Sequence, residues 1–400
     1  MPIALLALTI SAFAIGTTEF VIVGLLPTVA ADLQIGLPSA GLLVSLYALG
    51  VAIGAPVLTA LTGKLPRKTL LLGLMALFTL GNLLAWQAPG YHSLIAARIL
   101  TGLAHGVFFS IGSTIATGLV PKEKAASAIA IMFTGLTVAL VTGVPLGTFI
   151  GQHFGWRETF LAVSALGAIA FVVSLIFIPR SIPHTPPASL AQQFKVLAQP
   201  RLLLVYATTA VGYGGSFIPF TFLAPILQQS GFSAASVGWV MLVYGVSVAA
   251  GNIWGGKLAD RKGPIAALKI IFALLAAVLL VLNFTAPHPY LAVATVLLWG
   301  AVAFGNVPGL QVYVVRQAER YTPDAVDVAS GLNIAAFNVG IAFAAWAGGL
   351  VVTHLGLMHT PWIGAVVVLG ALALTCLSGR LDGQQKIPAR AAGQRRAPAH

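Results

Sequence analysis

Charge is what this chain has least of. Only 8% of its 400 residues are Asp, Glu, Lys or Arg, whereas a soluble globular chain carries about a quarter. Hydrophobic residues make up 58%. This composition excludes a soluble globular protein, and it excludes a disordered chain because disorder requires low hydrophobicity. A membrane span takes about 20 apolar residues, so the length allows roughly twelve helical spans.

Cysteine and the usual catalytic patterns are also missing. The single cysteine, Cys376, permits no internal disulfide. No nucleotide-binding loop, metal-ligand spacing or nucleophile elbow occurs. We therefore expect no enzyme activity, no cofactor and no metal. The net charge of +12 would suit nucleic acid, but the placement of the basic residues indicates membrane topology instead, and we expect no nucleic-acid partner.

Apolar runs are abundant, and they predict an all-α polytopic membrane protein. A helical span takes about 20 apolar residues. Several of the runs are only 17 to 20 residues long, which leaves helix tilt and local thinning of the bilayer open. The twelve runs cover 3–27, 41–61, 70–88, 93–119, 126–150, 160–178, 202–227, 237–258, 265–284, 291–315, 328–353 and 362–378.

The basic residues alternate with these runs. Of the 21 Lys and Arg residues, 19 follow an even-numbered span, and only Arg98 and Arg157 fall elsewhere. Cytoplasmic loops carry the excess of Lys and Arg in membrane proteins. The pattern predicts an even number of spans with both termini in the cytoplasm.

The chain divides into two halves with the same plan. We expect an N-terminal six-helix bundle over 1–179, a cytoplasmic linker over 180–201, a C-terminal six-helix bundle over 202–380 and a basic tail over 381–400. Three pairs of residues share an offset of 197 or 198: Pro27 with Pro225, Tyr47 with Tyr244, and Lys64 with Arg261. Parallel repeats of this kind build transporters that bind substrate between the halves near the bilayer midplane.

Four motifs carry a family resemblance. They are Gly256-Lys-Leu-Ala-Asp260-Arg261-Lys-Gly263 after span 8, Arg98-Ile-Leu-Thr-Gly102 in span 4, Gly143-Val-Pro145-Leu-Gly147 in span 5, and Gly155-Trp-Arg-Glu-Thr-Phe160 before span 6. Together they resemble signatures of the major facilitator superfamily and of its drug–proton antiporter branch, which includes the arabinose- and chloramphenicol-type bacterial efflux permeases. The resemblance covers the whole chain.

This resemblance implies the major facilitator fold in a bacterial inner membrane, with two pseudo-symmetric six-helix bundles. It also implies a cytoplasmic latch formed by Gly256, Asp260, Arg261 and Gly263, which we expect in the turn between spans 8 and 9. The equivalent turn of the first half has Gly63 where the aspartate would stand, so a symmetric latch is in doubt. A purely topogenic basic turn is the alternative.

Span 5 carries small residues at intervals of four. Gly135, Ala139, Gly143, Gly147 and Gly151 form one stripe, which allows close helix packing. Pro145 removes one backbone hydrogen bond and kinks the helix. The resemblance implies a gating bend, and a tight helix contact is the compatible alternative.

Glu19 is the only carboxylate inside a predicted span. Ionisable groups at membrane depth are costly and functional by default. From a rise of 1.5 Å per residue, Glu19 lies between Arg98 and His105 in depth, and those two share a helix face because they are seven apart. We expect one proton-coupling cluster of Glu19, Arg98 and His105. A structural ion pair between Glu19 and Arg98, and a hydrogen-bonded core role for His105, are the alternatives.

Other polar and aromatic residues within the spans are candidates for the substrate cavity. For the amides, hydrogen bonds between helices are the alternative, and for Tyr47 it is packing. These candidates are Tyr47, Tyr213, Phe217, Asn252, Asn306, Gln311, Asn333 and Asn338.

The sequence therefore predicts a monomeric, proton-coupled secondary transporter that exports drug-like or sugar-like small molecules across the bilayer by alternating access. Two alternatives stay open. One is a proton-coupled uptake symporter, because fold alone does not set direction. The other is a non-transporting membrane sensor on the same fold, although no separate output domain is visible.

Overall fold

The computed structural model describes residues 3–121, 124–182 and 189–384. Within these ranges, twelve helical segments are long and apolar enough to cross a membrane, which confirms the predicted number of spans. Helices suit this role because they satisfy every backbone polar group internally. The proline-rich centre of the expected linker and most of the expected basic tail lie outside the described residues.

The first half holds spans 1 to 6. Its helices, some of them parts of one span, are α1 (Ile3–Asp32), α2 (Leu37–Ile53), the π-helix η1 (Gly54–Leu58), α3 (Thr59–Leu61), α4 (Arg67–Trp86), α5 (Tyr91–Gly118), α6 (Ala125–Val138), the π-helix η3 (Ala139–Gly143), α7 (Val144–His153) and α8 (Trp156–Phe177).

A short helix, α9 (Leu190–Leu197), precedes the second half. Spans 7 to 12 are built from α10 (Pro200–Phe220), α11 (Leu223–Gln229), α12 (Ala234–Lys262), α13 (Pro264–Thr285), α14 (Pro289–Ala303), α15 (Asn306–Tyr321), η4 (Pro323–Ala325), α16 (Val326–His354), η5 (Leu357–His359) and α17 (Thr360–Gln384).

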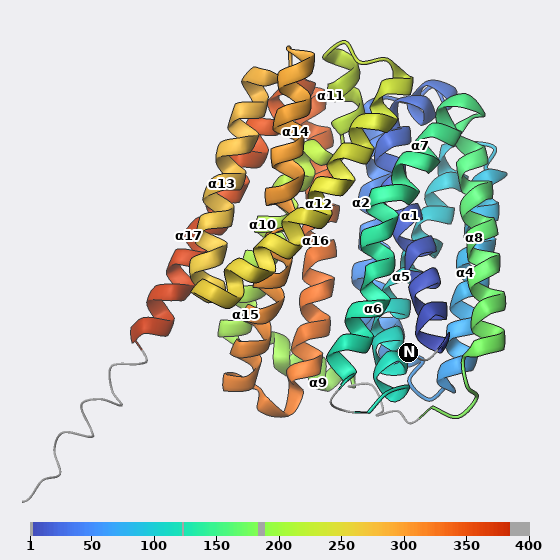
Figure 1. The fold of residues 1–400 in the computed structure, drawn as a ribbon, viewed down its shortest axis with the longest axis vertical. Coiled ribbons are helices and arrows are strands. Elements are labelled where there is room, and N and C mark those ends of the chain that lie inside the picture. Colours follow the sequence, from blue (N-terminus) through green and yellow to red (C-terminus); the bar gives the residue numbers. More distant parts are fainter. Residues whose placement is uncertain (1–2, 122–123, 183–188, 385–400) are drawn as a thin grey trace, which may run out of the picture.

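The two halves stand side by side, with α1 to α8 forming one bundle and α10 to α17 the other (Figure 1). They meet mainly where α2 packs along α16 and where span 5 packs along α12. Within the described residues, a direct hydrogen bond between the two halves runs from the Ser45 hydroxyl to the Ala342 carbonyl oxygen, at 2.7 Å. Phe20 of α1 also lies in an apolar core shared with Phe217 of α10.

Close glycine contacts repeat in the two halves. A β-carbon on Gly54 would lie 2.6 Å from the Leu103 carbonyl oxygen, between spans 2 and 4. The position 197 residues later, Gly251, approaches the Ala301 carbonyl between spans 8 and 10 in the same way. The sequence offset therefore corresponds to a repeated packing contact in space.

Three helix boundaries differ from the sequence-based expectation. The predicted runs for spans 1 and 7 are 3–27 and 202–227, but the helical segments continue to Asp32 and Gln229, and Pro27 and Pro225 both lie inside them. A proline in a membrane helix frees one carbonyl, which neighbouring helices and local adjustments can satisfy. Span 8 also runs further, to Lys262, so only Gly263, at φ 80°, remains as the turn before Pro264.

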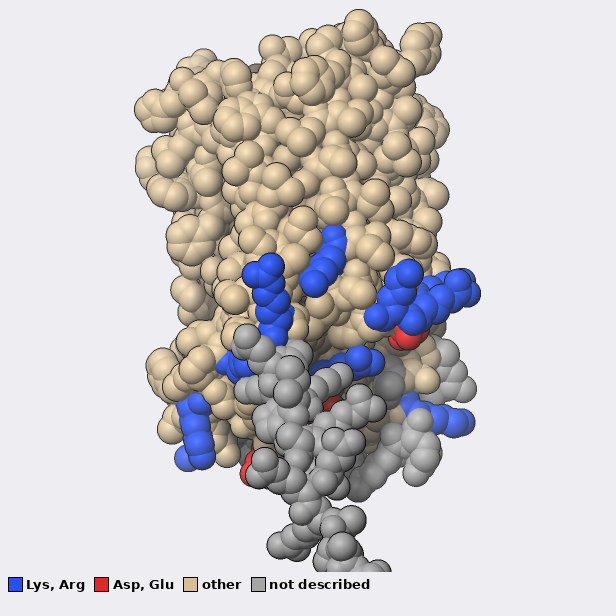
Figure 2. All heavy atoms as spheres, turned by 90° about the vertical axis from the view of Figure 1, so that its left-hand side faces the viewer, with Lys and Arg blue, Asp and Glu red and all other residues tan. Residues whose placement is uncertain are grey.

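Positive charge gathers at one end of the molecule. On the face shown in Figure 2, Lys and Arg occupy the lower part and the upper part shows none. We call this the basic end; it holds the connections from α3 to α4, from α12 to α13 and from α15 to η4. The distribution follows the alternation of basic residues along the chain.

Candidate functional site

Glu19 lies in the middle of α1 and is 9% exposed. It lines a cavity of about 10 Å³, roughly the size of one water molecule. The first half contributes Glu19, Phe20 and Tyr47 to this cavity, and the second half contributes Phe217 and Ile341. The only acid predicted inside a span therefore faces the boundary between the two bundles.

Arg98 of α5 is buried next to Glu19 but bonds to main-chain atoms. Its guanidinium donates to the carbonyl oxygens of Thr18 at 2.7 Å, Glu19 at 3.5 Å and Leu43 at 3.3 Å. No ion pair between the Arg98 and Glu19 side chains is present among the described residues. Arg98 thus ties spans 1, 2 and 4 together and leaves the Glu19 carboxyl group available.

Tyr47 connects Arg98 with His105. The Arg98 guanidinium carbon lies 4.0 Å from the centre of the Tyr47 ring, which is a cation–π contact. The Tyr47 hydroxyl shares a hydrogen bond of 3.0 Å with His105 Nδ1. The same nitrogen lies 4.0 Å from Glu19 Oε2. The structure therefore brings the three predicted coupling residues together, with Tyr47 as a fourth member.

An aromatic cluster continues from Glu19 into the second half. Phe20 lies 6.4 Å, between ring centres, from both Phe217 and Phe304. Tyr213 lies 4.9 Å from Phe217 and 5.5 Å from Phe304. The remaining rings are Phe220, Tyr244, Trp299 and Phe337. Of these eight residues, the sequence predicts only Tyr213 and Phe217 as cavity candidates, and it marks Tyr244 only as the repeat partner of Tyr47. The other aromatic side chains lie within apolar runs and give no separate signal.

The candidate amides separate into bonded and unbonded side chains. Asn333 accepts from the Thr209 hydroxyl at 2.7 Å and donates to Gln311 at 2.9 Å. Gln311 in turn donates to Ser330. These bonds join spans 7, 10 and 11, as expected for interhelical hydrogen bonding.

Asn306 is different because it is fully buried and neither of its amide atoms has a hydrogen-bond partner. It begins α15, directly after a break in span 10. Asn338 donates to the Ile334 carbonyl, while its own oxygen has no partner. Asn252 is half-buried and makes no side-chain hydrogen bond among the described residues. Unsatisfied buried amides are costly, so Asn306 and Asn338 are the amides best placed to gain a partner when the bundles move.

The span 5 stripe packs against α1. A β-carbon on Gly135 would lie 2.1 Å from the Thr9 carbonyl oxygen, and one on Gly147 would lie 2.5 Å from Val21. The same span meets the second half at its π-helix, where Gly245 of α12 approaches the Leu140 carbonyl. Pro145 follows this π-helix closely, in the first turn of α7. Span 5 therefore holds the helix that carries Glu19 on one side and contacts the opposite bundle on the other.

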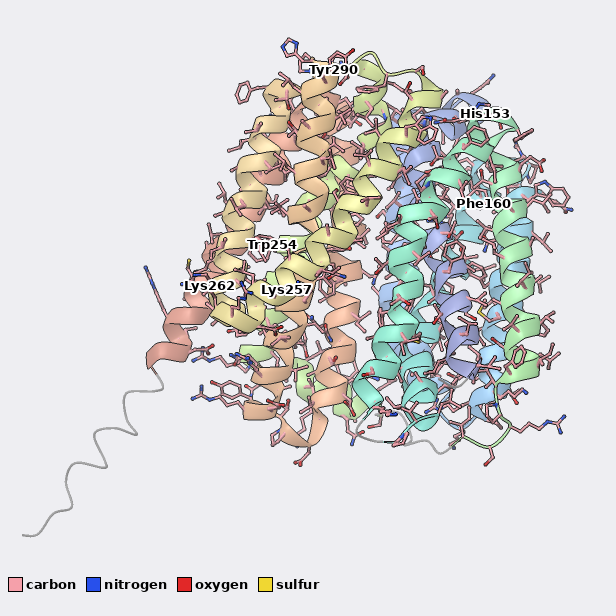
Figure 3. All side chains as sticks on the ribbon, viewed as in Figure 1. His153, Phe160, Trp254, Lys257, Lys262 and Tyr290 are labelled. Carbon is pink, nitrogen blue, oxygen red and sulfur yellow. The ribbon has the colours of Figure 1, made fainter. Side chains whose placement is uncertain are left out.

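The residues of the expected latch lie at the basic end of α12. Gly256, Asp260 and Arg261 belong to the helix itself, and Gly263 forms the turn. Asp260 is exposed and makes neither an ion pair nor a side-chain hydrogen bond within the described part of the chain. Figure 3 shows Lys257 and Lys262 on the same end of α12, which packs against α13. The predicted latch therefore has no side-chain contact through Asp260 in this part of the structure.

The residues that the structure describes offer no metal site, since no group of three or more His, Cys, Asp and Glu side chains could hold an ion. The ionisable group at the centre of the cluster is the buried carboxyl group of Glu19.

Comparison with known proteins identifies the family. Residues 8–326 match the family model described as Major Facilitator Superfamily. The chain belongs to the major facilitator superfamily. It is 55% identical over 384 residues to the uncharacterized MFS-type transporter YtbD of Bacillus subtilis, covering 96% of this chain and 97% of that one. It is 43% identical to the inner membrane transport protein YdhP of Escherichia coli K12, covering 94% and 96%.

More distant similarities agree. The putative transporter AraJ of Escherichia coli is 31% identical, covering 95% of this chain and 96% of its own. A solved bacterial homologue of the human lysosomal transporter Spinster, in an inward-facing and unoccupied conformation, superposes with a TM-score of 0.73 at 16% identity. The superposition covers 94% of this chain and 96% of the solved chain. At this identity the similarity shows the fold alone. The chain is thus a multi-pass membrane transporter of this superfamily.

Proposed function

We propose that the protein is a proton-coupled secondary transporter that exports small molecules by alternating access, with Glu19 as the proton carrier. The supporting observation is the position of Glu19. It is buried at mid-span and lines a water-sized cavity whose walls come from both bundles. Any rocking of one bundle against the other therefore changes the surroundings of its carboxyl group.

A carboxyl group in that position can couple protons to transport. Burial disfavours the ionised form, and contact with water or a nearby cation favours it. When the bundles open toward the proton-rich side, water reaches Glu19 and protonates it. When they open toward the cytoplasm, which the basic end faces in this proposal, the proton leaves and substrate enters in exchange.

The aromatic cluster supports an apolar or aromatic substrate more than a sugar. Rings of Phe20, Phe217, Tyr213 and Phe304 surround the region beyond Glu19, and offset or edge contacts with aromatic ligands are favourable. The cavity has no room for such a molecule in this conformation, so binding requires separation of the two bundles.

Vesicles test the proposal directly. The purified protein is reconstituted in liposomes that trap a pH-sensitive dye, and a panel of cationic dyes, phenolic drugs, nucleosides and sugars is added. We expect at least one aromatic compound to drive proton movement. We expect Glu19→Gln to abolish that proton movement while leaving downhill substrate exchange. The matched control is Asp327→Asn, an exposed acid at the start of α16.

The same vesicles determine direction. Export by exchange predicts that an imposed proton gradient drives substrate against the proton flow, whereas symport predicts movement with it. Proton movement that is unchanged in Glu19→Gln rejects the proposed carrier, and flux without any proton movement rejects the coupling.

A further inference from the structure

A hollow of about 420 Å³ lies on the surface of the first half, at the basic end. It is lined by Pro66, Lys68, Thr69 and Leu72 of the start of span 3 and by Leu175 and Arg180 at the end of span 6. The helices α4 and α8 that carry most of these residues pack side by side (Figure 1). The hollow is separate from the Glu19 site and has no part in the proposed transport path.

We propose that this hollow binds an anionic glycerophospholipid from the leaflet at the basic end. Both charged residues among its lining are cations, Lys68 and Arg180, and no carboxylate lines it. Basic pockets between membrane helices on the cytoplasmic side bind anionic headgroups. The pair therefore suits a phosphodiester that carries net negative charge.

Hydrogen-bond donors are available for the phosphate oxygens. Lys68 Nζ donates once, to the Leu175 carbonyl at 2.7 Å, and an ammonium group has three N–H donors, so two remain. Thr69 and Arg180 are exposed, and their side chains make no hydrogen bond within the described part of the chain. The Lys68 bond also fixes the ammonium group between the two helices, at the edge of the hollow.

The membrane side of the hollow suits an acyl chain. Leu175 is exposed on α8, and Leu72 is half-buried on α4 one turn deeper than Lys68. Beside Leu72, Gly73 is exposed, and a β-carbon placed on it would meet no atom within 4 Å. An acyl chain that extends from the headgroup into the membrane would pass over this open surface, between Leu72 and Leu175.

Topology alone does not explain these features. The positive-inside pattern requires Lys and Arg in the loop but not their position around a hollow. The corresponding positions of the second half, 197 residues later, replace Lys68 and Thr69 by Ile265 and Ala266. The site is therefore a property of the first bundle and not of the repeat.

Native mass spectrometry of the detergent-purified protein tests the assignment. Phosphatidylglycerol is titrated against phosphatidylcholine of the same acyl chains, and we expect preferential retention of phosphatidylglycerol. In the double variant Lys68→Gln/Arg180→Gln we expect affinity to fall about fivefold for each charge removed. The matched control, Lys195→Gln/Lys257→Gln, removes two basic residues outside the lining of the hollow and is expected to bind like the wild type.

Two further experiments distinguish a bound phospholipid from free phosphate in the hollow. Gly73→Phe fills the open surface and is expected to weaken phosphatidylglycerol binding, whereas Leu298→Phe, on the exposed surface of α14, is expected not to. Inorganic phosphate is expected to compete weakly, since it has no acyl chain. The proposal is overturned by equal retention of both lipids, by undiminished binding in the charge variant with a normal thermal unfolding curve, or by phosphate competing as well as the lipid.

Discussion

Gly143 of span 5 lies against Thr17 of span 1 so closely that a β-carbon at position 143 would be 2.2 Å from the Thr17 hydroxyl oxygen. The residues 197 positions later are Gly214 and Gly340, which also pack against each other. The repeat therefore preserves a contact while changing one partner from threonine to glycine. Thr17 is two residues before Glu19, so this contact also sets the position of the helix that carries the carboxyl group.

We predict that Gly143→Ala destabilises the protein and that Thr17→Gly restores much of the loss. The added methyl group overpacks a contact that has no room for it, at a cost of about 1–3 kcal/mol. Thr17→Gly recreates the glycine pair of the second half. Thermal unfolding in detergent measures the stability of the Gly143→Ala variant and of the double variant Gly143→Ala/Thr17→Gly.

Gly331→Ala is the control for the Gly143 variant, since a β-carbon there meets no atom within 4 Å. It is expected to change stability by less than about 0.5 kcal/mol. A Gly143→Ala protein as stable as this control would contradict the packing argument.

The role of Arg98 is decided by geometry as well as charge. Its guanidinium reaches carbonyl oxygens on α1 and α2 while lying over the Tyr47 ring. A lysine keeps the charge but is a point donor without the planar fork. We predict that Arg98→Lys lowers the free energy of unfolding by about 2–3 kcal/mol and that transport falls with it.

Arg157→Lys provides the comparison for Arg98. Arg157 also bonds a carbonyl, that of Ala88, and stacks on Trp156, but it is partly exposed. Arg157→Lys is expected to lower the free energy of unfolding by less than about 1 kcal/mol. Equal unfolding temperatures for the two lysine variants would show that Arg98 acts by charge alone.

Sequence reasoning succeeded where a single physical rule dominates. The twelve spans follow from apolar length, because lipid requires it. Glu19, Arg98 and His105 could be placed together from polarity and helical depth. The main-chain bonds of Arg98 could not be predicted, since they depend on how closely α1, α2 and α5 approach one another.

Helix ends were less predictable for a similar reason. The motif from Gly256 to Gly263 has the composition of a loop, but it continues α12 because Ala259 is buried against the bundle. Most of the aromatic cluster could not be predicted either, because phenylalanine in an apolar run gives no sign of whether it faces lipid or the opposite bundle.

The Tyr47 hydroxyl should matter for coupling, and the Tyr213 hydroxyl should not. Tyr47 bonds His105 beside Glu19, whereas Tyr213 contributes ring contacts and its hydroxyl has no hydrogen bond within the described residues. We predict that Tyr47→Phe lowers the proton-coupled flux about fivefold, which corresponds to one hydrogen bond of about 1 kcal/mol. Tyr213→Phe is expected to stay within twofold. The flux is measured in vesicles with the compound identified by the panel, and the reverse ranking would remove Tyr47 from the coupling cluster.

Two adjacent glycines at the end of span 8 offer the sharpest comparison. The motif begins at Gly256, yet the close approach to span 10 is made by Gly255, where a β-carbon would lie 1.9 Å from the Gly305 carbonyl oxygen. At Gly256 the nearest atom, in Pro308, would be 3.8 Å away. A carbonyl oxygen cannot move aside as a flexible side chain can, so overpacking here must displace one helix.

We therefore predict that Gly255→Ala lowers stability by about 3 kcal/mol or more, with loss of folded protein in the membrane. Gly256→Ala is expected to be neutral or slightly stabilising, because alanine is favoured over glycine within a helix by up to about 1 kcal/mol. Expression level and thermal unfolding of the two single variants, prepared in parallel, measure the difference. If Gly256→Ala proves the more damaging of the two, span 8 is held by its motif and not by contact with span 10.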